Sequence, residues 1–96
     1  MIYVDSMMST LRNRNWPYDE GCHLFCDVGE LESLHEFASR IALKRDWFQH
    51  KPKSLPHYDL TKGKRWQAVM HGAIELDRTE TVKRIHAWRA VAAVAT

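Results

Sequence analysis

The sequence predicts a mixed α/β domain in which a small sheet of about three strands is covered by about three helices. Hydrophobic residues alternate with polar ones near the N-terminus, as in a half-buried strand, and recur at helical spacing in three later segments. The chain has 96 residues, which is enough to bury one modest core. We therefore expect a single domain over residues 1–96.

The first strand is predicted at residues 2–5. Its side chains alternate between two faces, Ile2 and Val4 on one and Tyr3 and Asp5 on the other. Residues 6–21 have no clean period and contain asparagine, proline and glycine, so we expect a long loop there, with a helical turn near residues 7–12. Long loops in small domains often carry function.

A second strand is predicted at residues 22–26. It would place Cys22, Leu24 and Cys26 on one face and His23 and Phe25 on the other. Along such a strand the two cysteines would lie about 13 Å apart, beyond the reach of a disulfide. We therefore expect buried free thiols, the alternative being a thiol that binds a metal or reacts.

The first helix is predicted from Glu30 to about Leu43. Asp27 and Glu30 have the spacing of a capping box, and Lys44 and Arg45 would interact favourably with the negative end of the helix dipole. The hydrophobic residues of this helix fall on one stripe, formed by Leu31, Leu34, Phe37, Ala38, Ile41 and Ala42.

A second helix is predicted to begin after Asp59 or Thr61, either of which could cap it, and to end before Gly72. A third strand follows at residues 73–76 and can pair with the first through a crossover. The final helix, over residues 77–96, begins with a capping sequence. Because this helix is rich in alanine, it could pack against a second copy of the chain and form a homo-oligomer.

Composition and charge exclude several classes of protein. Hydrophobic residues make up 45% of the chain and charged residues 27%, as in ordinary globular proteins, and the net charge is only +2. There is no apolar run of the ~20 residues needed to cross a bilayer and no signal peptide, so we expect a cytoplasmic protein without a membrane partner. The fingerprints of serine hydrolases, P-loop NTPases and dinucleotide-binding folds are absent.

The strongest candidate site is the segment Leu55-Pro56-His57-Tyr58-Asp59-Leu60. Pro56 favours extended backbone, so His57 and Asp59 would share a side with their Cα atoms roughly 6 to 7 Å apart. We expect His57 to act as general acid or base, Asp59 to orient it, and Tyr58 to add a phenolic donor. The alternative is structural, with Asp59 capping the second helix and His57 tethering the loop.

Two basic residues and an aromatic group could complete a ligand site. Arg65 would lie in the first turns of the second helix, where its guanidinium and the free backbone N–H groups could hold a phosphate or carboxylate, and Lys64 lies beside it. Trp47 belongs to an aromatic group that could stack on a base, although such residues more often fill a core. Gln49 could recognise a base edge or a ribose.

A second candidate site involves His35, which faces inward on the stripe of the first helix. If that helix covers the sheet face that carries Asp5 and His23, the three residues could meet in a polar pocket. Such a pocket would suit a zinc or iron ion, or an acid/base pair, but an inward histidine is more often a hydrogen-bonded core residue. No established metal-binding spacing of histidine or cysteine is present, so no metal is predicted.

Several of these motifs occur in an order that resembles a known family. The most specific are His57-Tyr58-Asp59 and the following Lys64-Arg65. Together with other matching segments, they resemble the bacterial and phage family termed domain of unknown function 4031. These segments are residues 2–5, 22–24, 30–31, 35–38, 47–49, 68–69 and 72–73. The resemblance covers a core of about residues 2–76 and leaves residues 77–96 as a C-terminal helix extension. It implies a small stand-alone domain, often phage-encoded and then located in the host cytoplasm, with no established activity.

The leading hypothesis is a pocket that binds a phosphate-bearing, nucleotide-like ligand, with hydrolase or transferase activity if the protein is an enzyme. Its catalytic residues would be His57, Asp59, Tyr58, His23 and His35, and its ligand-binding residues Arg65, Asp5, Gln49, Trp47 and Lys64. The sequence does not identify a cofactor.

Two alternatives remain open. In the first, a non-enzymatic interaction protein would inhibit or recruit a host protein through exposed Met7, Met8, Leu11, Trp16 or the final helix. In the second, the protein would be a weak nucleic-acid binder whose affinity falls steeply with added salt.

Overall fold

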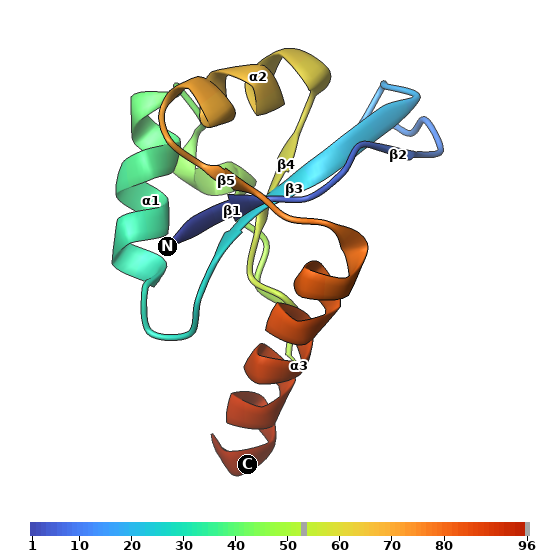
Figure 1. Cartoon of the computed structure of the whole chain (residues 1–96). Coiled ribbons are helices and arrows are strands. Elements are labelled where there is room, and N and C mark those ends of the chain that lie inside the picture. Colours follow the sequence, from blue (N-terminus) through green and yellow to red (C-terminus); the bar gives the residue numbers. More distant parts are fainter. Residues whose placement is uncertain (53, 96) are drawn as a thin grey trace.

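The computed structural model describes residues 1–52 and 54–95 and has a mixed sheet of five strands within them (Figure 1). The strands are β1 Ile2–Val4, β2 Met8–Ser9, β3 Glu20–Cys26, β4 Tyr58–Leu60 and β5 Ile74–Glu75. The helices are α1 Leu31–Arg40, α2 Lys62–Met70 and α3 Arg78–Ala95, with a 3-10 turn, η1, at Arg45–Trp47. The mixed α/β class is therefore confirmed, with two more strands than expected.

The central strand is β3, because its Leu24 pairs antiparallel with Val4 of β1 and with Tyr58 of β4. Strand β5 pairs in parallel with β1, so the predicted pairing of the third and first strands is confirmed. Paired residues point to the same face of a sheet. One face therefore carries Val4, Leu24 and Tyr58, and the other carries His23 beside its partner Asp59.

The chain from β1 to β2, which runs along one side of β3, contains one extra residue. Residues 5–7 separate Val4 from Met8, whereas only two residues separate their β3 partners Leu24 and Gly21. This three-against-two arrangement is that of a β-bulge, a device that redirects side chains. The helical turn predicted near residues 7–12 is wrong, because Met8 and Ser9 pair with β3 instead.

Helices α1 and α2 cover the sheet face of Leu24. They contribute buried Leu34, Phe37 and Ala38 from α1 and Ala68 from α2. The Lys64 ammonium joins the two helices by donating to the Ile41 carbonyl at 2.6 Å. This places the main core between the two helices and the sheet.

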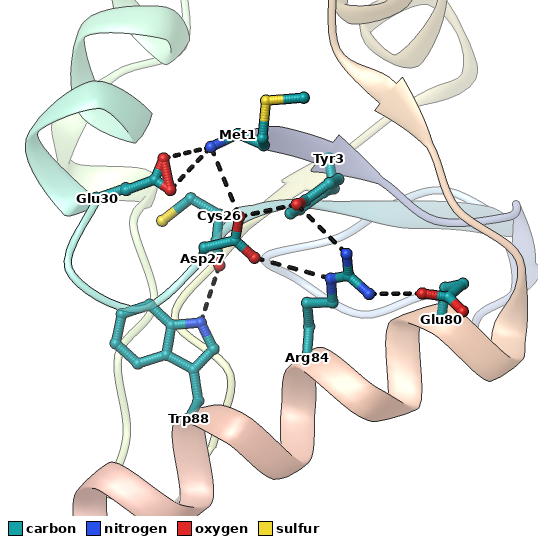
Figure 2. Close-up of polar contacts among 8 residues, drawn as sticks. All are labelled: Met1, Tyr3, Cys26, Asp27, Glu30, Glu80, Arg84 and Trp88. Carbon is teal, nitrogen blue, oxygen red and sulfur yellow. Dashed lines mark hydrogen bonds and ion pairs between the residues drawn. The ribbon is translucent and has the colours of Figure 1, made fainter.

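Helix α3 contacts the opposite side of the sheet (Figure 1). The Arg84 guanidinium lies over the Tyr3 ring, 4.9 Å from its centroid, and the Trp88 indole donates to the Cys26 carbonyl at 2.9 Å (Figure 2). These contacts attach the predicted C-terminal extension to β1 and β3. Residue 96, the last of that extension, lies outside the described residues.

Caps form at two of the three predicted positions, and at α2 the cap is Thr61 and not the alternative Asp59. Thr61 accepts a hydrogen bond from the Lys64 N–H at 3.2 Å, and Asp77 accepts one from the Glu80 N–H at 2.8 Å. The capping box at α1 is wrong, because the Glu30 carboxylate binds the N-terminal ammonium instead, as Figure 2 shows.

Helix α1 also ends earlier than predicted, at Arg40 rather than near Leu43. Ala42 has a positive φ of 60°, and this conformation terminates the helix because it breaks the right-handed path. No helix in the described part of the chain is long and apolar enough to span a membrane.

Candidate functional site

Two imidazoles and a carboxylate converge on the sheet face opposite α1. The Asp59 Oδ1 atom lies 3.4 Å from His57 Nε2 and 3.9 Å from His23 Nε2. The two imidazole rings meet edge to face, with 4.7 Å between their centroids. One nitrogen or oxygen from each of the three residues lies within 4.8 Å of the others. We call these three residues the HHD cluster.

The strand register explains why these residues meet. His23 and Asp59 are direct partners in the β3–β4 ladder. His57 precedes Asp59 by two residues and therefore points to the same face, so the predicted sharing of a side by His57 and Asp59 is confirmed. Gln49 forms a two-way backbone bridge with His57, at 2.9 and 3.0 Å, which holds the start of β4 in place.

The other ring nitrogen of each histidine has a fixed acceptor. His23 Nδ1 lies 2.7 Å from a carboxylate oxygen of Asp5, and His57 Nδ1 lies 2.7 Å from the Leu55 carbonyl oxygen. A carbonyl and an ionised carboxylate can only accept, so each Nδ1 carries the hydrogen in these bonds. In a neutral ring the Nε2 atom then has a free lone pair, which faces Asp59.

Asp5 and Gln49 orient the cluster further. Asp5 is only 7% exposed, and its second oxygen accepts the backbone N–H of His23 at 2.6 Å. The Gln49 amide donates to the second oxygen of Asp59. Residues outside the cluster therefore hold both an imidazole, through Asp5, and the carboxylate, through Gln49.

These contacts shift two pKa values. The hydrogen bond to Asp5 raises the pKa of His23, against the opposing effect of burial. Burial alone would raise the pKa of Asp59, but its contacts with His57 and the Gln49 amide outweigh burial and hold that pKa below its usual value. The site therefore favours a negative charge on Asp59.

Two cavities adjoin the cluster. The first, of about 230 Å³, reaches His23 and Asp59, and the second, of about 620 Å³, reaches Gln49 and Asp59. Trp16 lines both cavities. The walls of the second cavity include Trp16, Tyr18, Trp47 and Lys64. Because the side chains of His23 and Asp59 are 31% and 35% exposed, the cluster is accessible from solvent.

The structure divides the predicted polar pocket between the two faces of the sheet. His35 and Tyr58 lie on the α1 side, where His35 Nδ1 and the Tyr58 hydroxyl are hydrogen-bonded at 2.8 Å. Burial lowers the pKa of His35 and raises that of Tyr58, so both are neutral at pH 7. The expected meeting of His35 with His23 and Asp5 is wrong, because α1 covers the other face.

The predicted basic residues have partners within the fold. Arg65 donates to the Asp5 carbonyl at 2.9 Å and to the Glu75 carboxylate at 3.0 Å, so it braces the bulge instead of pointing at His57. Lys64 donates one hydrogen bond to the Ile41 carbonyl at the end of α1, and it also lines the larger cavity. Trp47 is 48% exposed on the wall of that cavity.

The Trp16 side chain was expected only in an interaction surface, but it lies between the two cavities. Its ring rests on Gly21, where an added Cβ would be 2.8 Å from a ring carbon. Its indole N–H is buried and has no hydrogen-bond partner among the described residues. The glycine at the start of β3 is the only sequence signal for this close approach.

Both cysteines are free and buried, as predicted. Burial raises the pKa of Cys22 and of Cys26 to about 12. Their thiols are therefore protonated at neutral pH and poor nucleophiles. Both belong to the face opposite His23, so neither contributes to the HHD cluster.

These features define a small mixed α/β domain with a two-histidine, one-carboxylate cluster on one face of its sheet. A family model described as protein of unknown function (DUF4031) matches residues 2–88, and the chain belongs to this family. The match continues into α3, beyond the limit near residue 76 expected from the motifs. No curated protein and no solved structure gives a significant match.

Proposed function

We propose that the protein binds a phosphate-bearing, nucleotide-like ligand beside the HHD cluster and acts on it as a hydrolase or transferase. The observation that carries the proposal is the convergence of two imidazole lone pairs on a carboxylate at the edge of an aromatic-walled cavity. Groups with free electron pairs can activate a water or a ligand hydroxyl for attack.

The larger cavity has the chemistry that a nucleotide requires. Its volume of about 620 Å³ is within the usual range for small-ligand sites. Trp16 and Trp47 offer ring faces for stacking on a base, and the Gln49 side chain offers an amide for its edge. The Lys64 ammonium has three hydrogens, of which the Ile41 carbonyl and a long contact to Gln67 use two, so one remains for a phosphate oxygen.

Binding is tested by titrating the protein with nucleoside mono-, di- and triphosphates in a calorimeter, with and without added divalent cation. Trp47→Ala should weaken binding roughly 5- to 100-fold, the range for loss of one base–aromatic stack. The matched control is Trp66→Ala, because Trp66 is 65% exposed on α2 and does not line the cavity. Equal affinities for the two variants, or no binding by the wild type, would overturn the proposal.

Turnover is tested by following nucleotide consumption with liquid chromatography. Asp59→Asn should abolish it while leaving nucleotide affinity within a few-fold of the wild type, because Asp59 lies at the cavity edge beside the reacting groups. Unchanged turnover in Asp59→Asn would remove the HHD cluster from the chemistry.

A second candidate function is protein binding, which is favoured by exposed apolar residues around the β2–β3 loop. Leu11 is 90% exposed, and Met8 and Tyr18 are about half exposed. An inhibitor or recruiter of a host protein would lose its partner on Leu11→Asp and keep it in 1 M salt. It would also be unaffected by Asp59→Asn, whereas the ligand-processing function would be lost.

A further inference from the structure

We propose that His23, His57 and Asp59 bind one divalent transition-metal ion, with zinc or ferrous iron best matched to the ligands. This inference extends the proposed function, because the ion would occupy the same HHD cluster, and it departs from the sequence prediction of no metal. Two imidazoles and one carboxylate are a ligand set used by catalytic zinc and by non-haem iron. The local spacing of His57 and Asp59 predicts that these two residues share a side, but the pairing of His23 with Asp59 depends on the register between β3 and β4.

The distances fit a shared ion better than direct hydrogen bonds. Asp59 Oδ1 lies 3.4 Å from His57 Nε2 and 3.9 Å from His23 Nε2. Both separations exceed the roughly 2.7–3.2 Å of ordinary N–H···O bonds. Two ligand atoms about 2.0–2.1 Å from a tetrahedral zinc lie about 3.4 Å apart, so His57 and Asp59 already have this spacing and His23 would move inward to complete the site.

The hydrogen bonds within the cluster also leave a place for a cation. Each Nδ1–H is already donated, to Asp5 from His23 and to the Leu55 carbonyl from His57. With neutral rings, the three atoms that face one another all carry lone pairs and none carries a hydrogen. Such a convergence requires either a proton on one imidazole or a cation among the three atoms.

Each of the three side chains is also held by a second partner on its far side. Asp5 binds His23, the Leu55 carbonyl binds His57, and the Gln49 amide binds Asp59. Protein metal sites commonly have this arrangement, because the outer hydrogen bonds fix the ring tautomer and the direction of each ligand. The site is thus organised before an ion arrives.

The cluster leaves room for further ligands of the ion. His23 and Asp59 are about one-third exposed and open onto the smaller cavity. Three protein ligands would leave at least one position for water, as in catalytic zinc sites, where the ion lowers the pKa of that water. In the proposed hydrolase this water would be the nucleophile.

The test is metal binding by chelator-treated protein in the absence of any nucleotide. Cobalt(II) should bind one ion per chain, give visible absorption bands, and be displaced by zinc. His57→Gln and Asp59→Asn should each weaken cobalt affinity more than 10-fold. Asp5→Asn should weaken it roughly 10- to 100-fold, the usual effect of losing a partner of a metal-bound histidine.

The matched control is His71→Gln, because His71 is an exposed histidine that follows α2. Its cobalt affinity should equal that of the wild type. Equal losses in His71→Gln and His57→Gln, or no wild-type binding at 1:1 stoichiometry, would overturn the metal site. If a cluster variant does not fold, the visible spectrum of cobalt(II) in the wild-type protein decides. Bands typical of cobalt with six water ligands would overturn the metal site, and bands typical of cobalt bound by nitrogen in a low-symmetry site would support it.

The metal site and the proposed function can be disproved independently. Cobalt binding at the cluster without any nucleotide binding would support the metal site and overturn the proposed nucleotide ligand. Nucleotide turnover that is unchanged in chelator-treated protein would support the proposed function and overturn the proposed metal site.

Discussion

The contact between Asp5 and His23 supports the sharpest prediction about stability. In Asp5→Asn the amide can still accept one hydrogen bond, but its NH2 group would face either the backbone N–H or Nδ1–H of His23. The change therefore removes one charge-assisted bond and leaves a partly buried donor without an acceptor. Together these losses should lower the unfolding free energy by about 2–4 kcal/mol.

The assay is thermal and urea unfolding of chelator-treated protein, followed by circular dichroism. For a domain of this size the expected loss corresponds to a fall in Tm of at least about 8 °C. Asp19→Asn is the control, because Asp19 pairs with Arg12 on the surface, where both side chains are well exposed. It should leave Tm almost unchanged.

The pH dependence provides a second readout of the same contact. Asp5 raises the pKa of His23 in the folded protein, so the contact contributes its full stability below the unfolded pKa of about 6.5. The contribution is lost as the pH rises through the higher folded pKa. The difference between wild type and Asp5→Asn should therefore be largest near pH 5.5 and should shrink above pH 7. A difference that is constant with pH, or equal losses in Asp5→Asn and Asp19→Asn, would refute the reasoning.

Three further predictions concern other parts of the molecule. Gly21→Ala should displace the Trp16 ring and cost about 1–3 kcal/mol; an unmoved indole N–H resonance would contradict this. Trp88→Phe should remove the bond to the Cys26 carbonyl and make α3 more sensitive to proteolysis, whereas unchanged cleavage would show that the bond does not hold the helix. The thiols of Cys22 and Cys26 should react slowly with a disulfide reagent at pH 8, and fast labelling of the folded protein would argue against their burial. Because the folded protein raises their pKa values to about 12, the unfolding free energy should also fall between pH 9 and pH 12.

Local patterns predicted much of the fold. Alternation in residues 2–5 and 22–26 identified two strands and the residues that share each face, because a two-residue period depends only on neighbours. The cap at Thr61 was predictable for the same reason, since its hydrogen bond reaches only three residues along the chain. Met8 and Ser9 were missed because a two-residue strand has no period to detect.

Long-range choices were not predictable from these patterns. The stripe of α1 shows that His35 faces inward, but it does not show which face of the sheet the helix covers. The capping box failed because the N-terminal ammonium, 29 residues from Glu30, competes for its carboxylate. The pairing of His23 with Asp59 depends on the register between β3 and β4, which no local pattern specifies.

The extra residue between β1 and β2 has an evolutionary consequence. Removing Ser6 would let β1 and β2 pair continuously with β3, without changing any side chain of the hydrophobic core. In a regular antiparallel ladder the His23 N–H would bond to the Asp5 carbonyl, so the Asp5 carboxylate would lose its bond to that N–H, and Arg65 would lose its carbonyl acceptor. Descendants of such a deletion would keep the architecture while Asp5 holds its histidine by one bond instead of two, so retention of the fold would be a poor guide to retention of the chemistry.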